Sequence, residues 1–259
     1  MSLPTIIAGP CAMESYELMH EVAVHMTQLS GDLGFKYVFK SSFEKANRSS
    51  VNSFTGPGIY AGIRLLSRLK DDLGVATTTD IHEPNHAKLL SDVVDIIQIP
   101  ALLSRQTALI VAAGETQRVV NIKRGQFMAP WKIHLLLEKM RSVSDRELII
   151  TERGSFNGYE DLIVDFRTLI ESRALGVSSG FDATHSVQRP SSRESDSGGS
   201  PEYIPFFASA AAAIGVDYLF FETHPDPSCA LSDGACMLPL QEMERVLKQV
   251  KAVAEVTQS

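Results

Sequence analysis

The sequence predicts a single closed (β/α)₈ barrel that spans residues 1–259. Short apolar or β-branched runs recur eight times, segments with helical periodicity lie between them, and polar residues follow the end of nearly every run. Eight repeats of strand and helix in about 250 residues are typical of this barrel. The alternative is an open, doubly wound sheet, but no GxGxxG motif follows the first run.

Each apolar run is rich in residue types that favour strands. In chain order the runs are TIIAGP from residue 5, YVFKSS from 37, ATTTDI from 76, IIQIPA from 96, VVNIKR from 119, ELIITER from 147, SGFDATHS from 179 and YLFFETH from 218. Helical periodicity is clearest in residues 16–29, 59–70, 161–174, 205–215 and 240–256. We expect Trp131 and the apolar residues around it to belong to the core.

Residues 187–202, VQRPSSRESDSGGSPE, form the least regular stretch of the chain and are rich in Ser, Gly and charge. They directly follow the seventh expected strand. Two interpretations stay open at this point. One is a disordered surface loop, and the other is a lid over the barrel mouth, where lids of such barrels are found.

The overall composition excludes several classes of function. The chain is 44% hydrophobic and 21% charged, which is ordinary for a globular protein, and its net charge is −7 at pH 7. This balance argues against a nucleic-acid or membrane-surface binder, because such proteins rely on broad basic surfaces. There is no apolar run of about 18 residues and no secretory pattern at the start, so we expect a cytoplasmic protein. Three cysteines, an odd number, predict reduced thiols.

Polar residues gather where the expected strands end, and a barrel of this type carries its chemistry at that edge. In strand order they are Lys40 and Ser42; Asp80; Gln98, with Arg105 beyond it; Asn121 and Lys123; Glu152 and Arg153; Asp182 and His185; and Glu222 and His224. The expected mouth thus holds five cations, with Arg105 as a further candidate: Lys40, Lys45, Arg48, Lys123 and Arg153.

One anion does not need so many cations. Guanidinium groups bind phosphate through paired hydrogen bonds, and lysines bind it as point charges. The count therefore suits two phosphate-bearing ligands, or one phosphate together with a carboxylate on each of two substrates. For any one of these cations alone, a salt bridge to a neighbouring carboxylate is the simpler interpretation.

A second group of residues suits a transition metal. Cys11, His185 and Glu222 end the first, seventh and eighth strands, which are adjacent in a closed barrel, and Asp233 follows in the next loop. A thiolate, an imidazole and two carboxylates form a metal-ligand set that does not select one metal. The alternative is a buried structural cysteine and a structural histidine. Cys229 and Cys236 are weaker ligand candidates, because their loop has no second Cys or His pair.

The motifs KSSFEKANRSS, TDIHEP, IIQIPALLSRQT, NIKRGQF, ITERGSF, FDATHSVQ and ETHPDP occur in this order. With them the chain resembles the 3-deoxy-D-manno-octulosonate 8-phosphate synthases over essentially its whole length. KANRSS is the most specific of these motifs. The related 3-deoxy-D-arabino-heptulosonate 7-phosphate synthases share the barrel and the phosphoenolpyruvate site but typically carry a KPRTS-type motif there.

The resemblance implies an enzyme that joins phosphoenolpyruvate to arabinose 5-phosphate and releases phosphate, in lipopolysaccharide precursor synthesis. It implies that Lys40, Ser42 and Lys45 surround phosphoenolpyruvate, and that Lys123, Arg153 and the backbone near Ala101 hold its phosphate. It implies that arabinose 5-phosphate is bound by Asn47, Arg48 and Ser49, with Arg105 of an adjacent subunit reaching its phosphate. Asp80 and Gln98 complete the expected substrate-binding set. The expected catalytic residues are Cys11, Lys45, Asn47, His185 and Asp233.

The family has one branch with a metal and one without it, and the metal branch carries Cys where the other carries Asn. Here the first strand supplies Cys11, and His185, Glu222 and Asp233 fall on the matching ligand positions. The resemblance thus implies a divalent metal, namely Zn, Fe(II) or Mn, and a homotetramer. Two positions depart from the family pattern: Leu102, where an aromatic residue is common, and the order of Phe156 and Asn157.

Two other functions compete with this expectation. One is a heptulosonate 7-phosphate synthase that uses erythrose 4-phosphate, which the context of Asn47 and Arg48 disfavours. The other is a barrel that binds sugar phosphates without catalysis. Such a sensor would bind both ligands without releasing phosphate, and it would have no need for the Cys, His, Glu and Asp set.

Overall fold

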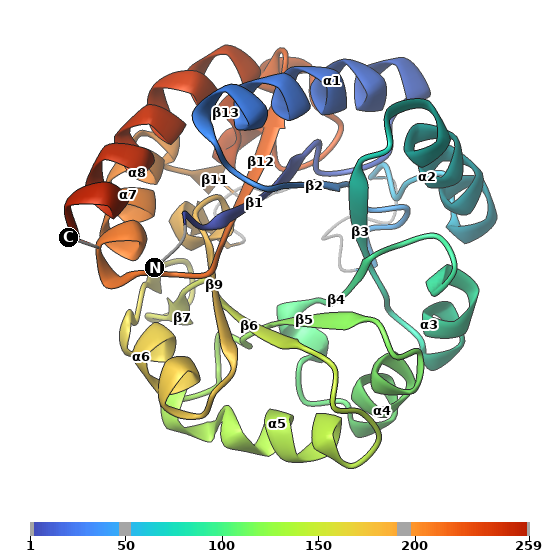
Figure 1. The fold of residues 1–259 in the computed structure, drawn as a ribbon, viewed down its shortest axis with the longest axis vertical. Helices are drawn as coiled ribbons and strands as arrows, with labels where there is room; N and C mark the ends of the chain where they lie inside the picture. Colours follow the sequence, from blue (N-terminus) through green and yellow to red (C-terminus); the bar gives the residue numbers. More distant parts are fainter. Residues whose placement is uncertain (1–2, 47–52, 191–197, 258–259) are drawn as a thin grey trace.

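A computed structural model describes residues 3–46, 53–190 and 198–257 of the chain. Over these ranges, eight parallel strands pair in chain order, and the last of them pairs with the first (Figure 1). The barrel strands are β1 (Thr5–Gly9), β2 (Tyr37–Lys40), β3 (Ala76–Asp80), β4 (Ile96–Ile99), β5 (Val119–Lys123), β6 (Leu148–Glu152), β9 (Ser178–Asp182) and β12 (Tyr218–His224). All eight expected strands form, so the closed barrel is confirmed and the open sheet is excluded.

The helices surround the barrel as an outer ring (Figure 1). They are α1 (Tyr16–Leu33), α2 (Ile59–Leu73), α3 (Pro84–Leu90), α4 (Thr107–Glu115), α5 (His134–Arg141), α6 (Arg167–Ala174), α7 (Ile204–Ile214) and α8 (Met243–Thr257). Local sequence signals set several of their ends. The Ser15 hydroxyl accepts a hydrogen bond from the Leu18 amide at the start of α1, and Gly34 ends that helix in a left-handed conformation. None of the helices in the described ranges is long and apolar enough to cross a membrane.

The helix predicted over residues 161–174 is wrong in its first part. Leu162–Ile163 instead form a short strand, β8, which pairs antiparallel with β7 (Ser155–Phe156). The helix α6 begins only at Arg167, because the Asp165 carboxylate accepts a hydrogen bond from the Arg167 amide and satisfies a free donor of the first turn. The apolar residues of this segment therefore fit a helical period without being helical.

The expectation that Trp131 belongs to the core is also wrong. Trp131 lies in a single 3₁₀ turn, η2 (Pro130–Lys132), and 55% of its surface is exposed. The turn follows an irregular loop after β5 and leaves the indole on the outer surface, with the Arg167 guanidinium 5.9 Å from its ring centre. The large apolar side chain is thus free for contact outside this chain.

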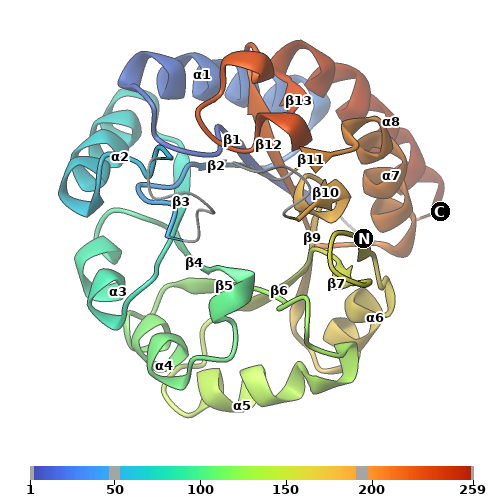
Figure 2. The ribbon, with the colours of Figure 1, turned by 180° about the vertical axis from the view of Figure 1, so that it is seen from behind.

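The segment after the seventh barrel strand is partly ordered. After η3 (His185–Val187), β10 (Gln188–Arg189) pairs antiparallel with β11 (Gly198–Gly199), and residues 191–197 lie outside the described residues. Further on, β13 (Leu238–Pro239) pairs with the end of β12. Figure 2 shows the face over which β10, β11 and β13 lie.

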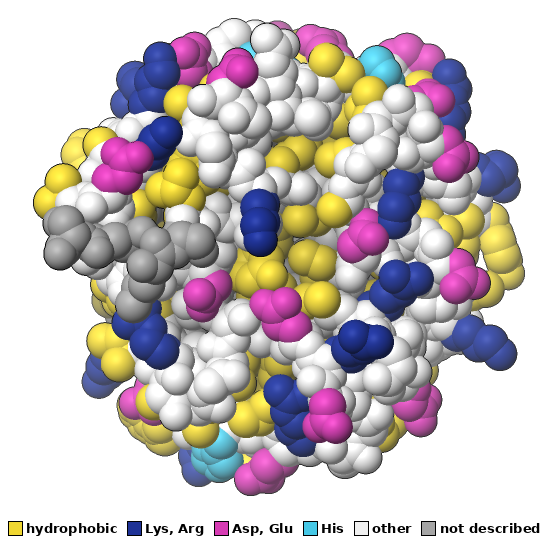
Figure 3. All heavy atoms as spheres, viewed as in Figure 1, with side chains coloured by type: hydrophobic (Ala, Val, Ile, Leu, Met, Phe, Trp, Pro, Cys, Tyr) yellow, Lys and Arg dark blue, Asp and Glu magenta, His cyan; other side chains and the backbone are white. Residues whose placement is uncertain are grey.

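Two kinds of layer fill the molecule. Between strands and helices, apolar side chains form two large buried clusters. Inside the barrel, Ile7, Val38, Ile96, Ile149 and Phe220 form a smaller apolar layer. The face in Figure 3 has hydrophobic side chains at its centre, with acidic and basic side chains interspersed around them. Toward the carboxyl ends of the strands the interior becomes polar, and the candidate site lies there.

Candidate active site

Buried lysines and carboxylates alternate around the carboxyl ends of the strands. Lys40, the last residue of β2, donates to the Glu222 carboxylate at 2.7 Å, and the side chains of both residues are buried. Lys45 lies 3.8 Å from the same Glu222 oxygen and donates to the Ser42 hydroxyl at 3.0 Å. Burial alone would lower the pKa of Lys45, but the acidic groups Cys11, Glu222 and Asp80 outweigh it and raise that pKa. The surroundings of Lys45 therefore favour its charged form.

Across the mouth lie two further buried cations, Lys123 and Arg153. Lys123 pairs with Asp182 at 2.5 Å and lies 3.5 Å from the centre of the Phe220 ring. Arg153 donates from Nη2 to the Gln188 side chain at 2.9 Å, but its buried Nη1 has no partner among the described residues. Burial lowers the pKa of both cations. A bound anion would supply an acceptor for Arg153 Nη1 and would place negative charge beside both cations.

Asp182 orients His185. Its carboxylate accepts from the His185 backbone amide at 2.8 Å and lies 2.8 Å from the imidazole Nδ1. Burial alone would raise the pKa of Asp182, but His185 and Lys123 outweigh it and hold that pKa well below its usual range. A ring proton on Nδ1 would donate to Asp182, and Nε2 then faces Glu222 and Asp233, as in carboxylate–histidine–metal arrangements.

The expected metal ligands come together where β1, β9 and β12 end. Ligand atoms of Cys11, Glu222 and Asp233 all lie within 4.8 Å of one another. His185 Nε2 is 3.6 Å from Glu222 Oε2 and 4.0 Å from Asp233 Oδ2. Glu222 Oε2 is buried and has no hydrogen-bond partner in the described part of the chain. A buried carboxylate oxygen without a partner, beside a thiol and an imidazole nitrogen, fits a divalent metal.

The Cys11 thiol is held among acceptors. Burial, and then the neighbouring Glu222 carboxylate, raise the pKa of Cys11 well above its ordinary value. Its Sγ lies 3.1 Å from Asp233 Oδ2 and 2.9 Å from the Ser232 hydroxyl. A metal bound here must therefore displace the thiol proton.

The loop that carries Asp233 is fixed by other residues. Asp233 has φ 51°, a left-handed conformation that is uncommon outside glycine. Glu14, in the loop after β1, accepts from the Leu231 amide at 3.0 Å and lies 3.9 Å from His224 Nε2. The sequence placed His224 at the mouth, and the structure places it beside this anchor, where its Nδ1 accepts from the Asp226 amide.

Several residues that the sequence assigned to the mouth are not seen in this cluster. Asn47, Arg48 and Ser49 fall outside the described residues. Arg105 is exposed, and its backbone carbonyl accepts from Lys139 Nζ at 2.8 Å. Glu152 was expected at the mouth, but it is fully buried in a pair with Arg124. Ala101 is buried in the turn η1 (Ala101–Leu103) that follows β4.

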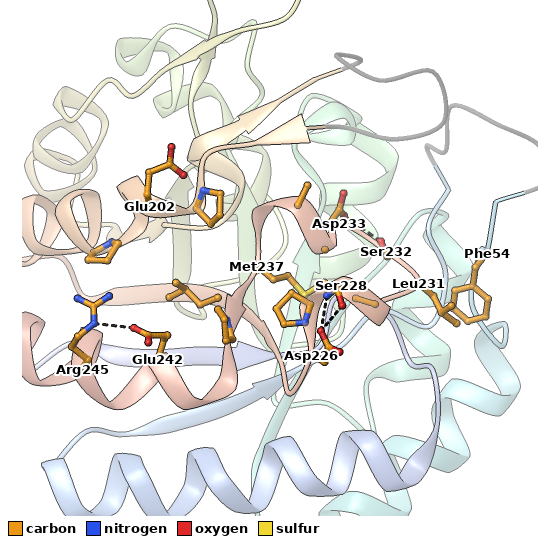
Figure 4. A pocket seen from close by; sticks show the side chains of 18 of the residues that line it. Phe54, Glu202, Asp226, Ser228, Leu231, Ser232, Asp233, Met237, Glu242 and Arg245 are labelled. Atoms are coloured by element: carbon orange, nitrogen blue, oxygen red, sulfur yellow. Dashed lines mark hydrogen bonds and ion pairs between the residues drawn. The ribbon is translucent and has the colours of Figure 1, made fainter.

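A groove of about 960 Å³ lies outside this cluster, along the segment between β12 and α8. Of the predicted site residues, Asp233 alone is among the described residues that line it. Figure 4 shows Phe54 and Leu231 next to one another at one end of the groove and Glu242 and Arg245 at the other. The buried cations of the mouth do not line the groove, which adjoins the cluster only through Ser232 and Asp233 among the described residues.

Comparisons with known proteins agree with this geometry. The DAHP synthetase I family matches residues 2–259. The chain belongs to this family. A Cyanothece protein named 2-dehydro-3-deoxyphosphooctonate aldolase is 46% identical over 248 residues, which cover 96% of this chain and 91% of that protein. A protein of the same name from Trichlorobacter lovleyi is 44% identical over 254 residues, covering 98% and 93%. These relatives confirm the resemblance to the octulosonate 8-phosphate synthases.

Two residues of the site were not recognised from the sequence. Ser232 was missed altogether, and Asp182 was placed at the mouth without a role. Asp182 could have been found, because it lies three residues before His185 at a strand end, within reach of its ring. Ser232 had no such signal, because its contact with Cys11 joins residues that are 221 positions apart. The side-chain amide of Gln98, which the resemblance assigns to substrate binding, donates to Asp80 and accepts from Asn121.

Proposed function

We propose that the protein condenses phosphoenolpyruvate with D-arabinose 5-phosphate and water, giving 3-deoxy-D-manno-octulosonate 8-phosphate and inorganic phosphate. The observation that carries this proposal is the buried Arg153, whose Nη1 has no partner among the described residues, across from the buried Lys123 and beside the Cys11, His185, Glu222 and Asp233 set. Relatives that are 44–46% identical over nearly the whole chain carry the matching name. Residues 1–259 act as one catalytic domain in this proposal.

The reaction moves charge at three places. Carbon 3 of the enol attacks the aldehyde carbon of the sugar, water adds to carbon 2, and phosphate leaves by cleavage of its bond to carbon 2. Lys123 and Arg153 hold the phosphate as its charge grows, and Lys40 and Lys45 hold the carboxylate. The cations, fixed by buried carboxylates before substrate binds, keep the two reacting carbons in contact. Arabinose 5-phosphate is assigned to Asn47, Arg48 and Ser49.

A divalent metal, which we propose to be Zn, Fe(II) or Mn, fits between Cys11, His185, Glu222 and Asp233. When bound, such an ion lowers the pKa of coordinated water or polarises an aldehyde oxygen. The residues of this chain prepare that place in advance. Asp182 fixes the His185 ring, and Glu14 fixes the loop that carries Asp233.

We also propose a homotetramer in which Arg105 serves the site of a neighbouring subunit. Arg105 is exposed, and the segments that follow β4 and β5 carry Leu102, Phe127, Trp131 and Leu135, all large apolar side chains with at least 40% exposure. Isolated exposed apolar residues are ordinary, but a group of this size marks an interaction surface. Because both substrates are phosphorylated metabolites, we place the reaction in the cytoplasm.

The first test measures phosphate release from phosphoenolpyruvate with arabinose 5-phosphate, before and after chelation and after divalent metal is added back. We expect activity to be lost on chelation and restored by metal. Cys11→Ala is expected to lose bound metal and most activity, whereas Cys229→Ala, which removes an exposed cysteine outside the cluster, keeps both. Cys11→Asn is expected to regain part of the activity without metal.

Each part of the proposal has its own contrary result. Faster turnover of erythrose 4-phosphate than of arabinose 5-phosphate would replace the octulosonate assignment by the heptulosonate one. Tight binding of both substrates without phosphate release would favour the non-catalytic sensor. Full activity in buffer verified to be metal-free would keep the synthase and remove the metal role.

A further inference from the structure

A chain of hydrogen bonds crosses the barrel interior below the cations. The Thr151 hydroxyl donates to Asn121 Oδ1 at 2.7 Å, Asn121 Nδ2 donates to Gln98 Oε1 at 3.0 Å, and Gln98 Nε2 donates to Asp80 Oδ1 at 2.5 Å. Thr151, Asn121 and Gln98 are each at most 1% exposed. The chain therefore runs from β6 through β5 and β4 to the end of β3, away from water.

The chain of hydrogen bonds continues from Asp80 to Lys45, at the proposed substrate site. The other Asp80 oxygen accepts from the Ser42 hydroxyl, and Lys45 Nζ donates to Ser42 Oγ at 3.0 Å. Lys40 Nζ also lies 3.7 Å from this second oxygen. Thr151, on the far side of the barrel, is thereby connected to Lys45, which the proposed function places against phosphoenolpyruvate.

The order of donors and acceptors along the chain is fixed from both ends. An ionised carboxylate only accepts, so Gln98 must turn its NH₂ group toward Asp80 and its oxygen toward Asn121. Asn121 must then turn its own NH₂ group toward Gln98, which leaves its oxygen facing Thr151. The Thr151 hydroxyl supplies the last donor. Without that donor, Asn121 Oδ1 is buried without a partner, and the hydrogen bond that holds the Asn121 amide from the β6 side is lost.

The fold makes room for this hydroxyl. A Cβ atom on Gly180, in the adjacent strand β9, would lie 2.3 Å from Thr151 Oγ1. Gly180 does not have a positive φ, so its backbone does not require glycine. Glycine is needed there because a side chain would collide with the Thr151 hydroxyl. The position of the Thr151 hydroxyl is thus built in by two strands.

We infer that Thr151 and Asn121 are positioning residues, which act through Gln98, Asp80 and Ser42 to hold Lys45 in its reactive position. The inference rests on the proposed function, because that function gives Lys45 its contact with phosphoenolpyruvate. Neither residue reaches the substrate in this assignment. Their effect on the reaction is transmitted by buried hydrogen bonds, in which every donor has one acceptor.

The test compares Thr151→Val, which keeps the shape and removes the donor, with Thr151→Ser, which keeps the donor. We expect Thr151→Val to lower kcat about ten-fold, since ten-fold corresponds to 1.36 kcal/mol, close to the net value of one hydrogen bond. The KM for arabinose 5-phosphate stays within about two-fold of wild type, because the chain does not lead to the residues assigned to the sugar. Thr151→Ser keeps a kcat within about two-fold of wild type.

Thr78→Val is the matched control. Thr78 lies in β3, is fully buried like Thr151, and its hydroxyl has no hydrogen-bond partner in the described ranges. The two substitutions change volume and polarity equally, so a packing effect alone would lower kcat in both. An equal loss in Thr78→Val, a wild-type kcat in Thr151→Val, or a loss in Thr151→Ser as large as in Thr151→Val would each overturn the inference.

A second readout does not depend on turnover. Exchange of the Gln98 and Asn121 side-chain NH₂ protons, followed by NMR in the full chain, is expected to accelerate in Thr151→Val and not in Thr78→Val. Equal exchange rates in the two variants would contradict the proposed chain of hydrogen bonds. A wild-type enzyme that released no phosphate would instead overturn the proposed function, even if the exchange rates differed as expected.

Discussion

At the scale of single residues, the charged side chains of the mouth pair with side chains from other strands. Lys40 ends β2, while its partner Glu222 lies 182 positions away in β12. The sequence predicted both residues at the same edge, because every barrel strand ends there. It did not predict which carboxylate each lysine would contact, since that choice depends on side-chain packing in the folded barrel.

Tyr37 gives a residue-level prediction about pH. Its hydroxyl donates to the Ala8 carbonyl at 2.9 Å, and burial raises the pKa of Tyr37 well above 10.0. A pKa that is higher in the folded state means that the folded protein keeps a proton which the unfolded chain loses as pH rises. This share of the stability is therefore complete below about pH 10 and is lost above it.

We expect Tyr37→Phe to be about 1 kcal/mol less stable than wild type at pH 8, because one partly buried hydrogen bond is lost. The difference should shrink or reverse at pH 11, since phenylalanine has no proton to lose. Urea unfolding at both pH values measures it, and Tyr60→Phe, at a residue that is 68% exposed, is the control. A difference between wild type and Tyr37→Phe that is unchanged at pH 11 would contradict the prediction.

At the level of elements, the clearest lesson comes from β5, β6 and the segments that follow them. Alternate residues of a strand face opposite sides, so Lys123 and Arg153 point into the barrel while their neighbours Arg124 and Glu152 point outward. Arg124 donates to both Glu152 oxygens, at 2.6 and 2.7 Å, and to the Ser155 hydroxyl at 2.8 Å. The alternation along β6 could have predicted that Glu152 points away from the mouth. The sequence analysis expected it at the mouth because it is charged.

This buried pair predicts a large effect on stability. The Thr168 hydroxyl in α6 also donates to Glu152, so the pair joins β5, β6 and α6. Arg124→Met leaves a buried carboxylate without its cation, which is expected to cost about 3–5 kcal/mol. The double variant Arg124→Met/Glu152→Met removes both charges and should be more stable than the single one. Urea unfolding tests this order, with Arg167→Met, at an exposed ion pair, as a near-neutral control. A single variant as stable as the double would contradict it.

Element boundaries show where sequence patterns fail. The eight strands were predicted because each is a short apolar run between polar segments, and a closed barrel demands all of them. The segment 161–174 failed because its apolar residues also fit a helical period, while the antiparallel contact of Leu162 and Phe156 makes a strand. Local periodicity carries no information about such a contact.

For the whole molecule, closure of the barrel is what makes the candidate metal site predictable. The pairing of β1 with β12 sets Gly9 beside Glu222, and Cys11 follows two residues later. Strand order alone therefore brings Cys11, His185 and Glu222 together. No comparable rule places residues on the outer surface. The exposed Trp131 was wrongly expected in the core because an apolar residue on the surface looks the same in a sequence as one in the core.

Association of subunits gives the last prediction. If Arg105 serves the site of a neighbour, Arg105→Ala and Lys45→Ala are both inactive alone but complement each other when their subunits are mixed. A site that combines an intact Lys45 with an intact Arg105 then forms in roughly a quarter of random pairings in a symmetric oligomer. Activity after dissociation and reassembly of an equal mixture measures this, with sedimentation to verify the tetramer. Absence of recovered activity in reassembled tetramers, or an active monomer, would place Arg105 outside the reaction.

The same association predicts the effect of a charge on the outer surface. Trp131→Glu, among the exposed apolar side chains that follow β5, should yield smaller and less active species, while Tyr60→Glu, on α2 across the barrel, should not (Figure 1).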